Sequence, residues 1–199
     1  MSLNTRIIQN FTPLLQKKND LLTIETECLY GEKFTVLKKE NDWCFGYLNY
    51  DNYHGWIKFV HIKKALKPNF LVTAPSTIIL NKPNIKSLVI DYLSIGSLVN
   101  VINFKDAWAE VNFYYNQKST IGYIPKIHLK SVDKPCLDWI NVAESMVGVP
   151  YKWGGKTNRG IDCSGLLQIS LKLSGKFAPR NSKDQIKELG YDLFTKKEL

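Results

Sequence analysis

The stretch Gly55-Trp-Ile-Lys-Phe-Val-His-Ile-Lys63 recurs later in the chain as Gly122-Tyr-Ile-Pro-Lys-Ile-His-Leu-Lys130. Upstream of each copy, four residues recur with identical spacing: Gly31, Phe34, Val36 and Trp43 in the first copy, and Gly96, Val99, Val101 and Trp108 in the second. Around these positions, short runs of alternating apolar residues are separated by polar turns, which predicts small all-β barrels. The internal repeat therefore predicts two β domains, over residues 20–66 and 70–132, after an N-terminal segment over residues 1–19.

Lysine dominates the charge of the 199-residue chain, which has a formal net charge of +9. Two interpretations stay open: a general compositional bias, since lysine, asparagine and isoleucine are all abundant, and attraction to an anionic polymer. Arginine, which reads bases with its planar fork, occurs only at positions 6, 159 and 180. We therefore expect no nucleic-acid partner, and a basic nucleic-acid binder is the most distant alternative.

The chain shows no sign of export. The first twenty residues contain no apolar run of signal-peptide length, and no later stretch approaches the roughly 18 apolar residues of a membrane span. The four cysteines form no CxxC pair and no zinc spacing: Cys28, Cys44, Cys136 and Cys163. We expect a reduced, cytoplasmic protein without metal, cofactor or membrane partner, with a Cys28–Cys44 disulfide as the alternative.

The repeat also explains two of the three histidines. His61 and His128 occupy the same position in the two copies, so one structural role accounts for both. His54 lies in a polar loop and is predicted to face solvent. None of the three is expected to serve as a catalytic base.

From residue 136 onward the apolar pattern becomes helical. It predicts helices over residues 139–147 and 163–173, and a last helix that begins at Ser182 with the capping box Ser182-Lys-Asp-Gln185. The predicted fold class is therefore α+β multidomain, with two small all-β barrels followed by a helical domain over residues 135–199.

Cys163 follows a glycine-containing loop and opens the second of these helices. The unpaired N–H groups and the dipole at a helix N-terminus stabilise a thiolate, which makes cysteine an effective nucleophile near neutral pH. The alternative is a buried cysteine that packs as a small apolar residue. The position of Cys163 alone favours that alternative, so the choice between nucleophile and packing residue depends on the surrounding motif.

The motif Gly148-Val-Pro-Tyr-Lys-Trp-Gly-Gly155, followed by Asp162-Cys-Ser-Gly165, resembles the NlpC/P60 cysteine peptidases. The later Pro179-Arg-Asn-Ser182 with Gln185 is similar to another element of that family. The paired β domains and Glu27-Cys-Leu-Tyr-Gly-Glu32 resemble its subgroup with SH3-like domains, which cleaves γ-D-glutamyl–diamino acid bonds in released murein peptides. The resemblance implies two SH3-like barrels and the helical N-terminal half of a papain-like domain.

The resemblance also implies roles for individual residues. It makes Cys163 the nucleophile, and it assigns Asp162 and Tyr151 to the free N-terminal amine of an L-Ala-γ-D-Glu peptide. A glutamate and a tyrosine from the first β domain would complete this amine site, and we expect Glu32 and Tyr53. Carboxylate and phenol oxygens are suitable partners for an ammonium group.

Ser164 and Ser182 are expected to donate to the substrate backbone or its carboxylate. For Ser182 the alternative is a helix N-cap, and Asp162 could be an N-cap and a ligand at once. For Glu32 the alternative is a solvated loop acid, and for Tyr53 a packed barrel aromatic.

The sequence departs from the family at the general base, which is a histidine downstream of the cysteine helix. No histidine occurs among residues 164–199. We therefore expect an apparent C-terminal truncation, no turnover by these 199 residues alone, and an uncovered helical surface that favours a homo-oligomer or the missing portion of the domain. The alternative function is a non-catalytic protein that binds wall peptides through its SH3-like domains.

Overall fold

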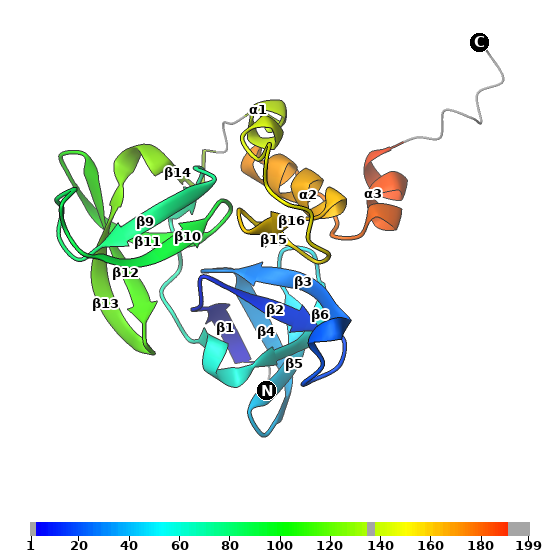
Figure 1. Cartoon of the computed structure of the whole chain (residues 1–199). Coiled ribbons are helices and arrows are strands. Elements are labelled where there is room, and N and C mark those ends of the chain that lie inside the picture. Colours follow the sequence, from blue (N-terminus) through cyan, green and yellow to red (C-terminus); the bar gives the residue numbers. More distant parts are fainter. Residues whose placement is uncertain (1–2, 135–137, 191–199) are drawn as a thin grey trace, which may run out of the picture.

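The computed structural model describes residues 3–134 and 138–190 (Figure 1). The described chain is mostly β, with two seven-stranded sheets and a small hairpin. Its α-helices all lie in the last third: α1 Trp139–Glu144, α2 Cys163–Leu173 and α3 Ser182–Leu189. In the part of the chain that the structure describes, none of the helices is long and apolar enough to cross a membrane.

The first sheet is antiparallel and has the strand order β3-β2-β6-β5-β4-β1-β7. Its strands are β1 Leu3–Ile7, β2 Phe11–Leu15, β3 Ile24–Leu29, β4 Lys33–Glu40, β5 Trp43–Leu48, β6 His54–Lys58 and β7 Ile62–Lys63. Alternate residues of these strands form its core, among them Leu14, Phe34 and Ile57. Strand β3 is an edge strand.

The second sheet repeats the topology of the first. Its strands are β8 Phe70–Val72, β9 Ser76–Leu80, β10 Val89–Ser94, β11 Leu98–Lys105, β12 Trp108–Tyr115, β13 Lys118–Pro125 and β14 Leu129–Ser131. The order β10-β9-β13-β12-β11-β8-β14 is the order of the first sheet with each strand number raised by seven. The repeat predicted from the sequence is thus a repeat of strand pairing.

The repeat begins earlier than the sequence motif suggested. Strands β1 and β2 lie within residues 1–19, which we assigned to a separate N-terminal segment, yet both pair within the first sheet. Leu14 and Leu15 are fully buried there. The first sheet therefore includes residues of the predicted N-terminal segment, because the apolar side chains of that segment complete its core.

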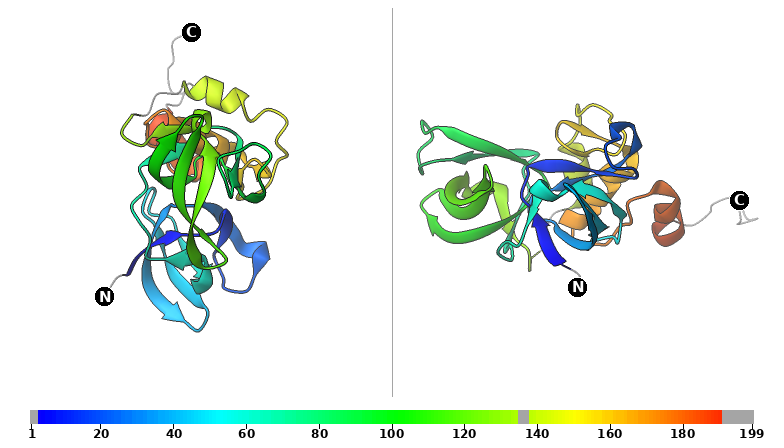
Figure 2. Two further views of the ribbon diagram at one scale, coloured as in Figure 1. Left: turned by 90° about the vertical axis from the view of Figure 1, so that its left-hand side faces the viewer. Right: turned by 90° about the horizontal axis from the view of Figure 1, so that it is seen from below.

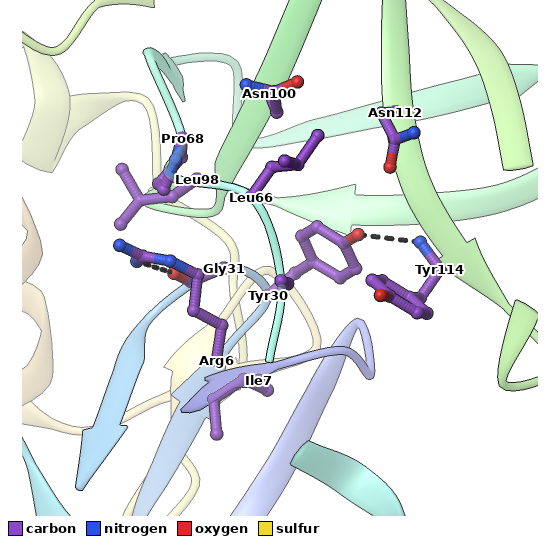
Figure 3. A pocket seen from close by; sticks show the side chains of 11 residues that line it. Arg6, Ile7, Tyr30, Gly31, Leu66, Pro68, Leu98, Asn100, Asn112 and Tyr114 are labelled. Carbon is purple, nitrogen blue, oxygen red and sulfur yellow. Dashed lines mark hydrogen bonds between the residues drawn. The ribbon is translucent and has the colours of Figure 1, made fainter. Parts of the chain in front are cut away.

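The two sheets contact each other at the turn between β3 and β4 (Figure 3). Leu98 N–H donates to the Tyr30 carbonyl at 2.8 Å, and the Tyr30 hydroxyl accepts from Tyr114 N–H at 2.9 Å. Gly31 has φ +78°, and a Cβ there would lie 2.0 Å from the Leu98 carbonyl oxygen, so only glycine fits. A cavity of about 20 Å³ remains beside Arg6, which is enough for one water molecule.

The helical part packs against both sheets, near the edge of the first sheet where β3 lies (Figures 1 and 2). Ile169 and Leu173 of α2 join a buried cluster with Leu29 of the first sheet and Leu71 of the second. Helix α2 is thus largely covered, so the uncovered helical surface that we expected does not lie on it. Exposed apolar side chains lie instead on α1 and α3, including Trp139, Ile140 and Ile186.

Candidate active site

Cys163 is the first residue of α2 and its side chain is exposed. It lines a pocket of about 360 Å³ between the first sheet and the helical part. The pocket is lined by Ile24, Glu25, Tyr53, Tyr151, Trp153, Asp162, Cys163, Ser164, Arg180, Asn181, Ser182, Lys183 and Asp184. Six of the seven predicted site residues are therefore brought together, and Glu32 is the exception.

The Asp162 carboxylate is held by the chain itself. It accepts the Gly165 N–H at 2.7 Å as the N-cap of α2, and the Gly154 N–H at 2.8 Å. The Arg180 guanidinium donates to both of its oxygens, at 2.9 and 2.7 Å. Burial alone would raise the pKa of Asp162, but the hydrogen bonds and charge of Arg180 lower it. A substrate amine at Asp162 would have to share the carboxylate with these donors.

A second carboxylate, that of Glu25, also lines the pocket. Tyr53 donates its hydroxyl hydrogen to Glu25 at 2.7 Å, and the same oxygen lies 2.9 Å from Oδ1 of Asn181. Burial and the neighbouring Glu25 raise the pKa of Tyr53 to about 12, so its hydroxyl stays protonated. Glu25 is half-buried and carries no ion pair among the described residues.

The structure corrects the prediction for Glu32. Its side chain is buried, 3.5 Å from the Lys156 ammonium and 2.9 Å from that of Lys172, and it accepts the Leu29 N–H at 2.8 Å. Burial would raise the pKa of Glu32, but the two lysines lower it to about 2. Glu32 therefore stabilises the junction of sheets and helices, and Glu25 is the glutamate of the first sheet that faces the pocket.

Ser164 and Ser182 both line the pocket, but in different settings. The Ser164 hydroxyl accepts from Arg180 at 2.7 Å, and its carbonyl accepts from Gln185 at 2.8 Å. Ser182 is exposed and is the first residue of α3, whose N-cap is Asn181. The structure thus contradicts both the N-cap alternative for Ser182 and the predicted capping box, because Gln185 reaches back to Ser164.

Of the described cysteines, Cys28 and Cys44 are not candidates for the nucleophile. Cys28 and Cys44 are buried free thiols, so the alternative disulfide is not formed. Burial raises the pKa of both groups. Cys136 lies outside the described residues.

His61 and His128 end equivalent one-turn helices beside the two sheets, consistent with the repeat, whereas His54 is the first residue of β6 and not part of a loop. Nδ1 of His61 is 2.6 Å from the Thr12 hydroxyl, and Nδ1 of His128 is 2.8 Å from the Thr77 hydroxyl, which is the equivalent pair. His54 is exposed and contacts the rings of Phe45 and Tyr47. Of the described residues that line the Cys163 pocket, none is a histidine.

Two charged pocket residues that bond other lining residues, Arg180 and Glu25, were not among the predicted site residues. Arg180 was noted only as part of the motif Pro179-Arg-Asn-Ser182, and the signal that could have singled it out is that the chain has only three arginines. Glu25 and Glu27 are two residues apart on β3 and look alike in the sequence. Only the position of β3 at the sheet edge shows that Glu25 faces the pocket.

Known proteins resemble the chain in both parts. Residues 22–59 match the bacterial dipeptidyl-peptidase SH3 domain, and residues 148–198 match the NlpC/P60 family. A γ-D-glutamyl-L-lysine dipeptidyl-peptidase of Bacillus cereus is 29% identical over 190 residues, which cover 81% of this chain and 54% of that protein. Dipeptidyl-peptidase 6 of Lysinibacillus sphaericus is 29% identical over 196 residues, or 87% of this chain and 72% of the relative.

A similar fold occurs in the crystal structure of an NlpC/P60 family protein from Bacillus cereus. The TM-score is 0.80 at 19% identity, over 93% of this chain and 77% of that one. The chain spans about half the length of the first curated relatives that it matches, 54% and 58%. These matches confirm the resemblance predicted from the sequence: residues 22–59 are similar to the bacterial dipeptidyl-peptidase SH3 domain, and residues 148–198 are similar to the NlpC/P60 family.

Proposed function

We propose that the chain belongs to a cysteine peptidase that hydrolyses the γ-D-glutamyl–diamino acid bond of free murein peptides. The observation that carries this proposal is the pocket that joins Cys163 to the Glu25–Tyr53 pair. The thiolate of Cys163 attacks the γ-carbonyl carbon and the diamino acid leaves as an amine. Water then hydrolyses the thioester and regenerates the thiol.

The free N-terminal amine of the peptide lies against Glu25 and Tyr53 in this proposal. Glu25 supplies the negative charge and the Tyr53 oxygen a lone pair, which suits an ammonium group. Tyr151 and Ser182, both exposed at the pocket, contact the peptide between its amine and the scissile bond. A peptide with a blocked amine would leave the Glu25 carboxylate without a cationic partner.

Proton transfer to the leaving amine commonly contributes about 100- to 10,000-fold to such reactions. The described residues at the pocket include no histidine for this step. The proposed enzyme therefore takes its base from a residue beyond those at the described pocket. The alternative function, peptide binding without hydrolysis, needs only the amine site.

The domain assignments remain part of the proposal. With the first barrel extended to include β1 and β2, residues 3–66 and 70–132 form SH3-like barrels and residues 135–199 the helical half of a papain-like domain. The shared strand order and the match of residues 22–59 support this interpretation. We place the enzyme in the cytoplasm, where it would process released peptides.

Calorimetric titration tests the amine site. L-Ala-γ-D-Glu-L-Lys should bind, and its N-acetylated form should bind about 10- to 100-fold more weakly, as expected when a hydrogen bond to a charged group is lost. Glu25→Gln should weaken binding of the free peptide similarly, whereas Glu40→Gln, on the same sheet but outside the pocket, should not. Equal affinity for both peptides would refute the amine site, and analysis of the titrated samples for free lysine separates hydrolysis from binding alone.

A further inference from the structure

Arg180 forms hydrogen bonds with the residues on both sides of Cys163. Its Nη1 atom donates to the Asp162 carboxylate at 2.9 Å and to the Ser164 hydroxyl at 2.7 Å, while Nη2 donates to the other Asp162 oxygen at 2.7 Å. The arginine is 3% exposed. The backbone of Cys163 is thus held between two side chains that share one guanidinium group.

The Nε–H group of Arg180 donates to a side chain of the first sheet. The acceptor is the hydroxyl of Thr26, at 2.7 Å. Thr26 is fully buried on β3. The planar guanidinium fixes the relative direction of all these bonds, so the Thr26 hydroxyl determines how the other donors meet Asp162 and Ser164.

We propose that Arg180 is the positioning residue for the Cys163 thiol and that Thr26, from the first sheet, orients Arg180. This inference rests on the proposed function, because it assumes that Cys163 is the nucleophile. A small displacement of a reacting group can cost up to about 100-fold in rate, so the orientation of one guanidinium group is enough to matter. The first sheet then contributes to the reactivity of the thiol as well as to recognition of the amine.

The test compares the rate of Cys163 alkylation by iodoacetamide, read by mass spectrometry, in matched variants. Thr26→Val keeps the shape of the side chain but removes the acceptor, and it should slow alkylation by about tenfold, the rate equivalent of about 1.4 kcal/mol. Thr26→Ser restores the hydroxyl and should restore the rate. The control is Thr5→Val, since Thr5 is also a buried threonine of the first sheet, and its hydroxyl donates to the Phe34 carbonyl at 2.9 Å.

Arg180→Lys keeps the charge without the planar fork and should slow alkylation at least as much as Thr26→Val. Circular dichroism confirms that each variant is folded. Equal rates in wild type and Thr26→Val, or equal slowing by Thr26→Val and Thr5→Val, would overturn the inference alone. A wild-type Cys163 that reacts no faster than the buried Cys28 would overturn both the inference and the proposed function.

Discussion

Replacing Glu32 with glutamine should destabilise the fold without disturbing the Cys163 pocket. Glu32 is 3% exposed and bonds the ammonium groups of Lys156 and Lys172, which come from different parts of the helical domain. The Lys156 side chain is itself only 2% exposed. Removal of the carboxylate charge would leave this lysine buried without its partner, and such changes typically cost about 3–5 kcal/mol.

The pKa of Glu32 gives an independent magnitude. It falls from an ordinary 4.5 to about 2 in the folded protein, and a difference of that size corresponds to about 3 kcal/mol at neutral pH. Because the folded pKa is lowered, this stabilisation is complete above the unfolded pKa and is lost as the pH falls toward 2. At pH 3 less than half of the neutral value should remain.

Urea denaturation at pH 7 and pH 3 measures this difference, with Glu40→Gln as the control. Glu40 also bonds two lysines, Lys18 and Lys38, but it lies at the surface. Surface ion pairs contribute little, so its loss should hardly change the free energy of unfolding. Equal effects of the two substitutions at pH 7, or a Glu32→Gln effect that does not shrink at pH 3, would refute the reasoning. Slower Cys163 alkylation in a folded Glu32→Gln protein would contradict the correction of its role.

Iodoacetamide should modify Cys163 faster than Cys28 or Cys44, because the latter two are buried and their pKa values are raised. Equal labelling of the three cysteines in peptide mass maps would refute this prediction. Replacing His61 or His128 by glutamine should lower the melting temperature but leave the Cys163 alkylation rate unchanged, since each ring bonds a threonine within its own sheet. A reduced alkylation rate in either histidine variant would show that an imidazole reaches the thiol.

Local patterns in the sequence predicted the repeat and the helix start at Cys163, whereas the pocket residues were predicted from the family resemblance. Apolar alternation determines which residues enter a sheet core, and the N-cap Asp162 starts the helix through a bond to the Gly165 N–H, three residues further on. Which of Glu25 and Glu32 faces the pocket does not depend on a local pattern. Both are acids near β3, and only the docking of the helical part buries Glu32 between two lysines and leaves Glu25 at the pocket.

The same docking makes the first sheet part of the site. As an edge strand, β3 has backbone groups that no neighbouring strand bonds. The glycine turn before α2 bonds one of them, since Glu27 N–H donates to the Gly154 carbonyl at 2.8 Å. The Glu27 carboxylate also accepts the Lys156 N–H, at 3.0 Å. The two residues before Glu27 then reach the site: the Thr26 hydroxyl accepts from Arg180, and Glu25 lines the pocket. One strand therefore closes a sheet edge, orients the arginine beside the nucleophile and supplies the charge for an amine. A helical domain separated from this strand would keep Cys163 but lose both the anchor of Arg180 and the amine site.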